Sequence, residues 1–376
     1  MAGLSQEQRM IVSSVRDLAE SEFAADAGTW EGEFPRRNVE LLAENGFLGL
    51  NVDEAYGGAG LSEFEAMLVI DAVGQVCPDT GYALNVQHFF PLIVQEYGSE
   101  AAKERYLPPI VEGRAMIATA ISEPEAGSDV MSMETTVRET DGELVLNGQK
   151  TWVSDVRESE VVIVWTMFEG EGLGSVLVDL DADGLEVGEH FTNMAGHTQT
   201  QLFFEDVTVP PENVLVRGDV ARQFEALNWE RLGNAAMLNG MMAFAADRAL
   251  EYASDRTQFD QPIVDFQGIE WKFAEMVKRL EASRSLAARA GQRARERGDT
   301  PDRLESSIAT LFASESAEQL VSEALQIHGA NGYQQGHPLE YLYRFVRGFR
   351  IGAGTDEIQR NQIAAVVKQR GIPTVE

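Results

Sequence analysis

The feature that most constrains this fold is a change in the spacing of apolar residues along the chain. Up to about residue 116 the spacing is helical, as in Ile11, Val15 and Leu18 behind a Ser5-x-x-Gln8 capping box. From residue 117 to about 216 the apolar runs have the length of strands, and helical spacing returns from about residue 223. Because 376 residues are enough for two or three packed domains, we predict three segments. They are an N-terminal helical domain (1–116), a middle β domain (117–217) and a C-terminal helical domain (218–376).

The middle and C-terminal segments have patterns that predict particular architectures. In the middle segment, Asn147-Gly148 lies between two apolar runs and is a strong signal for a tight hairpin. Several short strands separated by turns are typical of a small barrel or sandwich, and we expect a β-barrel. Long helical stripes with short links after residue 223 predict a four-helix bundle. The fold class is therefore mainly α with a central β domain.

Charge and cysteine content exclude several classes of protein. The chain has 30 basic and 61 acidic residues, a net charge of −31, so a partner with a phosphate backbone is not expected. Such an acidic surface tolerates high salt and indicates either a salt-adapted source or simply an acidic cytosolic protein. No apolar run is long enough to insert in a membrane, and the N-terminus MAGLSQEQRM does not resemble a secretory signal. With Cys77 as the only cysteine, we expect a cytoplasmic protein. No histidine pair has metal-ligand spacing, so we expect no metal.

Two blocks in the middle segment are candidates for holding a planar cofactor. Residues 119–129 read as a strand that ends in a loop containing proline and glycine. Backbone N–H groups and a serine hydroxyl there could bond the polar edge of a ring, although an ordinary strand-to-loop corner has the same composition. In the block 150–154, Trp152 is either core packing or a surface against an aromatic cofactor, with Ser154 bonding a ring atom.

Two further blocks lie in the C-terminal segment. Arg256, in a loop between helices, could bind a pyrophosphate bidentately or form a surface ion pair with Asp255. The stretches 326–333 and 354–358 contain clustered glycines, which allow close approach of backbone. Neither stretch is a Walker A loop or a Rossmann fingerprint, because the lysine and the strand–glycine–helix context are missing.

Taken together, these four blocks closely resemble the acyl-CoA dehydrogenase family of FAD flavoproteins, in register over almost the whole chain. Most members carry a catalytic glutamate immediately before the Gly354-Thr355 pair, where this chain has Ala353. The isovaleryl-CoA and long-chain acyl-CoA dehydrogenase branch instead carries the base in an earlier Glu-Arg-Leu string on a helix. Glu230-Arg231-Leu232 matches that string, so the chain most resembles this branch. A lone helical glutamate is usually solvated, but the alanine at 353 makes Glu230 the candidate base.

The resemblance implies desaturation of an acyl-CoA to a trans-2-enoyl-CoA. Glu230 would remove the α-proton while a β-hydrogen leaves as hydride to flavin N5. An apolar pocket must raise the pKa of the carboxylate for this step. Donors to the thioester carbonyl must also stabilise the enolate, by roughly 3–4 kcal/mol each. One of them is the backbone N–H before Gly-Thr, which Ala353 retains.

The resemblance also implies a set of binding residues and partners. Those lining FAD would be Thr119, Ile121, Ser122, Gly127, Ser128, Trp152 and Ser154. Those contacting the FAD of a neighbouring subunit would be Arg256, Phe259, Gln267, Gln326, Gly329 and Ala330, with Thr355, Asp356 and Glu357 closing over the cofactor. Substrate contacts would come from Ser128, Asn228, Arg231, Ala353 and Gly354. The implied assembly is a homotetramer, and the implied electron acceptor is an electron-transfer flavoprotein.

Two departures from the family pattern affect the substrate site. Asn228 replaces a commoner aspartate, and residues 194–197 replace a usual arginine, so CoA contacts there are not carried over. If Glu230 is not the base, the same scaffold could serve an acyl-CoA oxidase, a nitroalkane oxidase or a desulfinase. A non-catalytic protein that binds flavin or acyl-CoA is the remaining alternative.

Overall fold

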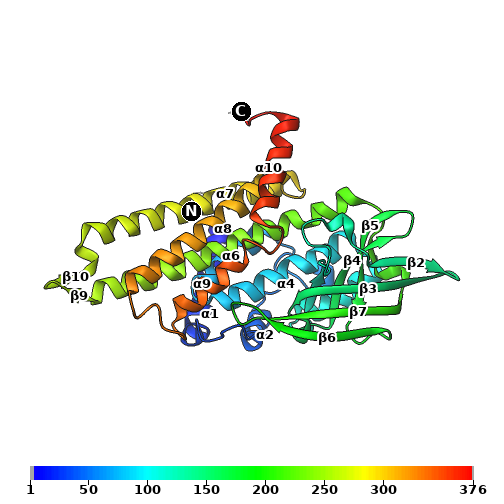
Figure 1. Ribbon diagram of the computed structural model, residues 1–376, viewed down its shortest axis with the longest axis horizontal. Helices are drawn as coiled ribbons and strands as arrows, with labels where there is room; N and C mark the ends of the chain where they lie inside the picture. The colour runs from blue at the N-terminus through cyan, green and yellow to red at the C-terminus, as the bar shows by residue number, and fades with distance from the viewer. Residues whose placement is uncertain (1–3, 375–376) are drawn as a thin grey trace. The chain divides into compact units, whose positions relative to one another are not determined.

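The computed structural model describes residues 4–374 and begins with helices (Figure 1). Helix α1 (Gln6–Glu22) opens with the predicted capping box: the Ser5 hydroxyl accepts from the Gln8 N–H at 3.1 Å, and the Gln8 side chain accepts from the Ser5 N–H at 2.9 Å. The other helices of this segment are α2 (Arg36–Glu44), α3 (Glu63–Gly74), α4 (Pro78–Tyr97) and α5 (Glu100–Val111). The predicted N-terminal helices are confirmed.

The chain forms two compact units that are not consecutive in sequence. One unit comprises Met1–Glu31, Phe64–Asn85 and Asn228–Glu376, and the other comprises Gly32–Glu63 and Val86–Leu227. Their dividing line falls inside the long helix α6 (Val220–Asp255), between Leu227 and Asn228. We call them the helical unit and the sheet unit. The three-segment division at residues 116 and 217 stays a prediction.

The sheet unit contains one mixed eight-stranded sheet. Its strands are β1 (Ile117–Ala120), β2 (Thr136–Thr140), β3 (Glu143–Ser154), β4 (Val161–Phe168), β5 (Gly172–Asp179), β6 (Leu185–Thr192), β7 (Thr198–Val209) and β8 (Val214–Val216). The order is β6-β7-β3-β2-β4-β5-β8, with β1 paired to β4. A barrel needs every strand to pair on both sides, but β6 and β8 each pair on one side in the described residues. The central sheet is confirmed, whereas the predicted closed barrel is not found.

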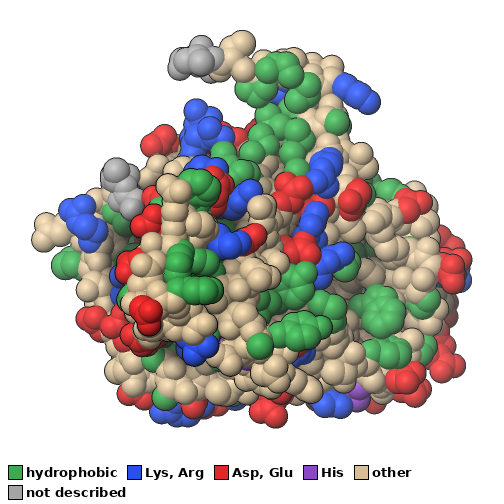
Figure 2. Space-filling view, turned by 60° about the vertical axis from the view of Figure 1, so that its left-hand side comes forward, with side chains coloured by type: hydrophobic (Ala, Val, Ile, Leu, Met, Phe, Trp, Pro, Cys, Tyr) green, Lys and Arg blue, Asp and Glu red, His purple; other side chains and the backbone are tan. Residues whose placement is uncertain are grey.

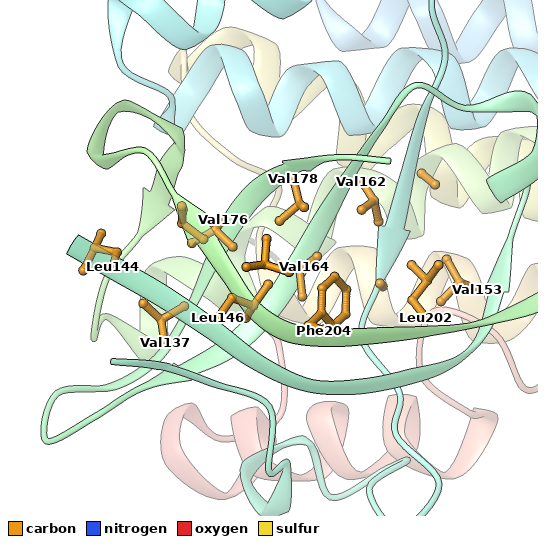
Figure 3. Packing of buried hydrophobic residues seen from close by; sticks show 14 of the residues in the cluster. Val137, Leu144, Leu146, Val153, Val162, Val164, Val176, Val178, Leu202 and Phe204 are labelled. Carbon is orange, nitrogen blue, oxygen red and sulfur yellow. The ribbon is translucent and has the colours of Figure 1, made fainter. Parts of the chain in front are cut away.

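The sheet encloses an apolar cluster built from alternate positions of its strands. Figure 3 shows Leu146, Val164 and Phe204 pointing toward one another from three different strands. Val162 and Val164 are fully buried, and their partners on β5, Val178 and Val176, are buried opposite them. β-branched side chains pack well on such a pleated surface, which is why this segment favours strands over helices.

The Asn147-Gly148 pair does not form the predicted hairpin turn. Both residues lie inside β3, at a shift in the register between β3 and β7, and the turn between β2 and β3 is at 141–142 instead. Gly148 has φ 142°, and a Cβ there would lie 2.6 Å from the Thr135 Cα. Asparagine and glycine tolerate unusual backbone conformations in a bulge as well as in a turn, so the dipeptide alone does not distinguish the two.

The C-terminal helices are confirmed. After α6 come the short strands β9 (Thr257–Gln258) and β10 (Gln261–Pro262), then α7 (Gln267–Arg297), α8 (Arg303–His328), α9 (Pro338–Gly348) and α10 (Asp356–Arg370). Helices α7, α9 and α10 all contact α8, and α6 reaches α8 through a bond from the Thr310 hydroxyl to the Arg231 carbonyl. The predicted bundle has four helices, and the short helix α9 is present in addition to α6, α7, α8 and α10. Small residues such as Ala313 and Ala317 on α8 are fully buried and let the helices approach closely.

The surface carries many acidic side chains, as the net charge of the sequence predicts. On the face drawn in Figure 2, acidic side chains lie among scattered basic side chains. Within residues 4–374, no helix is both long and apolar enough to cross a membrane.

Candidate active site

The predicted base lies on α6 in the helical unit. Its neighbours Trp229 and Leu232 are buried, and the Glu230 Oε2 atom has no exposed surface. That oxygen also has no hydrogen-bond partner among the residues that the structure describes. Burial raises the pKa of Glu230 to about 7, although the positive charge of Arg231 acts in the opposite direction. The side chain as a whole is half-buried, which leaves room for a ligand to approach the carboxyl group.

Arg231, beside the base, is a buried cation with few partners. Its Nη1 donates to the Asn228 Oδ1 at 2.8 Å, and the Ser306 hydroxyl of α8 donates to the same oxygen at 3.3 Å. The Nε of Arg231 has no partner in the described part of the chain. Since Asn228 is an amide, it satisfies one N–H without neutralising the charge. The positive charge of Arg231 therefore lowers the pKa of Glu230 without being neutralised by a carboxylate at position 228.

The loop between α9 and α10 carries the predicted substrate contacts Ala353 and Gly354. Both are left-handed, with φ 56° and 90°, and for alanine this conformation costs about 1–2 kcal/mol. Their carbonyls accept from the Gln359 side chain at 3.2 and 3.1 Å. The N–H groups of Ala353, Gly354 and Thr355 donate no hydrogen bond within the described residues. Successive free N–H groups of this kind form an anion-binding concavity, which suits the developing charge on a carbonyl oxygen.

The three residues expected to close over the cofactor have different settings. The Thr355 hydroxyl caps α10 by accepting from the Ile358 N–H at 3.2 Å, and Glu357 is exposed. Asp356 is buried, and both of its oxygens are occupied, by the Ser314 hydroxyl at 2.8 Å and by Arg350 Nε at 2.6 Å. Asp356 therefore holds the loop rather than presenting a free carboxylate.

In the sheet unit, a buried ion pair joins the two blocks expected to line the flavin. Lys150 Nζ donates to the Glu123 Oε1 and to the Ile121 carbonyl, both at 2.8 Å. Glu123 also accepts from the N–H groups of Glu134 and Thr135, at 2.6 and 3.0 Å. Both side chains are almost fully buried, and burial lowers the pKa of Lys150 to about 8 despite the carboxylate. The loop after β1 is thus fixed against β3.

This fixed loop has room for an external group. Ser122 accepts at its carbonyl from the Thr151 N–H at 2.9 Å, which places the loop beside the strand that carries Trp152. Gly127 and Ser128 are exposed, and a Cβ built on Gly127 would meet no atom of this chain within 4 Å. Thr119 and Ile121 are half-buried beside them.

Trp152 is not a core residue. It lies in a β-bulge between Lys150 and Val153, has φ 59°, and leaves 53% of its surface exposed. Its ring centroid lies 5.0 Å from that of Phe191 on β6. Ser154, two positions on, is half-buried at the end of the strand. An exposed aromatic face next to free polar groups fits a flat heteroaromatic ring such as the flavin of FAD.

The structure brings Arg256 and the glycine-containing stretch after α8 together around one pocket of the helical unit. The pocket has a volume of about 410 Å³ and is lined by Arg248, Glu251, Tyr252, Asp255, Arg256, His328, Asn331, His337 and Pro338. The His328 ring stacks on Tyr252 with centroids 4.4 Å apart. No ion pair between Arg256 and Asp255 is present in residues 4–374. Two arginines and two histidines here suit an anionic group such as a pyrophosphate.

The other residues expected to face a neighbouring subunit are exposed. Phe259 leaves 89% of its surface free at the tip of the β9–β10 hairpin. Gln267, Gln326, Gly329 and Ala330 are exposed as well. Sequence reasoning missed Arg248 and His337, although Arg248 and Tyr252 are four residues apart on one face of α6 and Arg256 follows directly after its end.

The comparisons with known proteins agree with this arrangement. Three models of the acyl-CoA dehydrogenase family match in order: the N-terminal domain at residues 5–114, the middle domain at 118–207 and the C-terminal domain at 220–368. The chain belongs to the acyl-CoA dehydrogenase family. It is therefore an enzyme of the oxidoreductase class that acts on CH–CH groups, with FAD as the expected cofactor.

The relatives include proteins named as reductases and proteins named as dehydrogenases. The chain is 34% identical to 3-(aryl)acrylate reductase of Clostridium sporogenes, over 96% of this chain and 98% of that one. It is 31% identical to the caffeyl-CoA reductase–Etf complex subunit CarC of Acetobacterium woodii, over 97% and 99%. It is 32% identical to the mitochondrial short-chain specific acyl-CoA dehydrogenase of Mus musculus, over 96% and 90%.

Solved structures share the whole fold. Butyryl-CoA dehydrogenase from Megasphaera elsdenii has a TM-score of 0.91 at 27% identity, covering 98% of this chain and 100% of that one. An acyl-CoA dehydrogenase complexed with FAD from Bacillus anthracis has a TM-score of 0.89 at 28% identity, covering 98% and 67%.

Proposed function

We propose that this enzyme desaturates an acyl-CoA thioester to a trans-2-enoyl-CoA, with Glu230 as the base. The observation that carries the proposal is the buried Glu230 Oε2, which has no partner within the described residues and belongs to a carboxyl group with a pKa of about 7. A carboxylate oxygen that is shielded from water and has no donor is more basic than an exposed one, which brings it closer to a weakly acidic α-proton. The alanine at 353 leaves no carboxylate at the alternative position.

The proton step uses two groups of this chain. The α-proton moves to Glu230 Oε2, and the electron pair of the broken C–H bond passes into an enolate whose oxygen carries the charge. The free N–H of Ala353 would donate to that oxygen, and such a donor is worth roughly 3–4 kcal/mol in comparable sites. FAD, when bound, supplies the acceptor for the hydride that leaves the β-carbon. Neutral Glu230 then holds the α-proton.

The cofactor and substrate contacts are proposed on the residues already described. Thr119, Ile121, Ser122, Gly127, Ser128, Trp152 and Ser154 would line the flavin, and Asn228, Arg231 and Ser128 the substrate. Arg256, Phe259, Gln267, Gln326, Gly329 and Ala330 would contact the FAD of a neighbouring subunit, an assignment that the arginine-lined pocket and the exposed Phe259 support. Thr355, Asp356 and Glu357 would close over the cofactor, and Asp356 would do so by holding the loop in place.

Two features of assembly follow from the same proposal. Contacts to a neighbour's FAD require an oligomer, which we propose to be a homotetramer. An electron-transfer flavoprotein is the proposed electron acceptor, and the relative named as part of a reductase–Etf complex supports it. The isovaleryl-CoA and long-chain branch remains the proposed position within the family, on Glu230 and Ala353.

An anaerobic substrate panel tests the proposal. The oxidised protein is mixed with acyl-CoAs of different length and branching, and loss of the visible flavin absorbance is followed. Bleaching without oxygen uptake supports a dehydrogenase, and rapid peroxide formation in air would instead indicate an oxidase. No bleaching with any thioester would leave a flavin- or acyl-CoA-binding protein.

The assignment of the base has its own test. Glu230→Gln should keep its FAD and lose the rate of bleaching by several orders of magnitude, because the amide cannot accept the proton. Glu225→Gln removes an exposed carboxyl group from the same helix and serves as the matched control. Near-normal bleaching in the Glu230→Gln variant would rule Glu230 out.

A second candidate is the reverse reaction, reduction of a 2-enoyl thioester. Two relatives named as reductases favour it. A carboxyl group with a pKa near 7 can donate a proton to the α-carbon as readily as it can remove one. Reduced protein mixed anaerobically with enoyl-CoAs would reoxidise quickly in that case. The ratio of the forward and reverse rates, together with the acceptor that reoxidises the protein, separates the two directions.

A further inference from the structure

The loop before α10 is closed into a ring by one arginine. Arg350 near its start donates through Nε to the Asp356 Oδ2 at its end, at 2.6 Å. The Asp356 N–H in turn donates to the Arg350 carbonyl at 3.1 Å. The two ends of the segment 350–356 are thus joined by a side-chain bond and a backbone bond. This ring contains Ala353, which is not itself bonded to either end.

The ring is also fastened to α8. Arg350 Nη1 donates to the Glu318 Oε2 at 2.5 Å, and the Ser314 hydroxyl donates to Asp356 Oδ1 at 2.8 Å. The side chain of Asp356 is 4% exposed, and those of Glu318 and Arg350 are 20% and 32% exposed. Charge-assisted bonds that are partly shielded from water fix geometry better than fully exposed pairs do.

A third group sets the orientation of the peptides inside the ring. Gln359 Nε2, one turn into α10, donates to the carbonyls of both Ala353 and Gly354. With these carbonyls held by α10, the N–H groups of Ala353, Gly354 and Thr355 are left without acceptors in the described residues. A left-handed alanine persists only where its surroundings over-determine it, and here Arg350 and Gln359 provide that constraint.

We propose that Arg350, together with Gln359, is a positioning residue for the reaction: the ring that it closes through Asp356 and Glu318 fixes the N–H of Ala353 where the thioester carbonyl binds. The proposal rests on the proposed function, because it needs Ala353 N–H as a donor to that carbonyl. Arg350 itself touches no substrate in this scheme. It acts only through the loop.

The test compares Arg350→Gln with Arg350→Lys and with a matched control. Arg370→Gln removes another arginine of the same region, which joins the end of α10 to Asp302 at the start of α8 at 2.9 Å. Each variant is purified with FAD, and the limiting rate and the half-saturating concentration of anaerobic flavin reduction are measured separately. The second readout is exchange of α-protons with deuterated solvent in a 3-thiaacyl-CoA. That analogue has sulfur at the β position, so it can lose an α-proton but has no β-hydrogen to give.

Arg350→Gln should lower both the limiting rate and the exchange rate by about tenfold to a hundredfold, as expected when a donor is displaced by a fraction of an ångström to 1 Å. The half-saturating concentration should change less than threefold, and Arg350→Lys should recover part of the loss. Arg370→Gln should behave like the parent. If Arg350→Gln does not fold, Gln359→Met replaces it, since this change removes only the bonds to the two carbonyls and should lower the same two rates.

The outcomes separate this proposal from the proposed function. If the unmodified enzyme shows neither bleaching nor exchange, the assigned reaction itself fails. If it shows both, and Arg350→Gln or Gln359→Met stays within twofold of it in both rates, then only the positioning role is overturned. A loss confined to the half-saturating concentration would also overturn it, because a misplaced donor must slow the proton step.

Discussion

Replacing Glu230 with glutamine should make the folded protein more stable above neutral pH while it abolishes the reaction. The carboxyl group has a pKa of about 7 in the folded protein against an ordinary value of 4.5, because burial disfavours its charge. Because the pKa of Glu230 is higher in the folded state, the folded protein holds a proton that the unfolded chain has lost between the two pKa values. The stability that goes with this proton is fully present below about pH 4.5 and is lost as the pH rises through 7. Glutamine cannot ionise and escapes that loss.

The magnitude follows from the shift. Each pKa unit corresponds to 1.36 kcal/mol, so an ionised Glu230 costs about 3.3 kcal/mol of unfolding free energy at pH 8 and about 0.8 kcal/mol at pH 5. The difference between the two pH values is about 2.5 kcal/mol. For a chain of 376 residues, this corresponds to a shift in melting temperature of about 3 °C.

The assay is thermal unfolding at pH 5 and pH 8 with excess FAD, followed by circular dichroism. The quantity compared is the melting temperature of Glu230→Gln minus that of the parent. It should be more positive at pH 8 than at pH 5, and the exposed-site control Glu225→Gln should show no such change. If the difference in melting temperature is the same at both pH values, the pKa of Glu230 is not raised by an apolar setting. The argument that Glu230 is the base would then fail.

The remaining predictions concern the neighbours of these groups. Asn228→Asp places a second carboxylate beside Arg231, so the pKa of Glu230 should rise and the acid limb of flavin reduction should move up by about one pH unit. An unmoved limb in the rate–pH profile would contradict this. Lys150→Met leaves Glu123 charged and buried without its cation, which should cost about 3–5 kcal/mol and weaken FAD binding in a fluorescence titration. The double variant with Glu123→Gln should recover most of that stability. If the double variant is no better than Lys150→Met, the ion pair is not what holds the loop.

Local patterns predicted the helices well because helix formation depends on nearby residues. The Ser5–Gln8 capping box was predicted in full, since both partners lie within one turn. The Asn147-Gly148 pair was assigned to a turn because a turn and a bulge demand the same backbone freedom. What separates them is the pairing with β7, and sequence spacing does not contain it.

The candidate site was predicted only where a single residue carries the signal. Glu230 could be named because the lack of a glutamate at 353 is visible in the sequence, but its burial could not, because α6 is buried on several faces. The ring closed by Arg350 joins α9, α8 and α10, so it exists only after the helices pack. The sequence placed Asp356 near the cofactor and did not indicate that both of its oxygens are already bonded.

The bulge at Trp152 has a consequence for how this strand can change over time. Leu144, Leu146 and Lys150 are buried before it, Thr151 is buried within it and Val153 is buried after it, so the buried positions switch from even to odd. Deleting Thr151 would restore simple alternation but remove the N–H that holds the Ser122 carbonyl, and deleting Trp152 would remove the indole and turn Thr151 outward. Single-residue deletions should therefore be rejected here, although substitutions on either side remain possible. The extra residue of the bulge leaves the Trp152 ring exposed, while both halves of β3 keep buried side chains in the core.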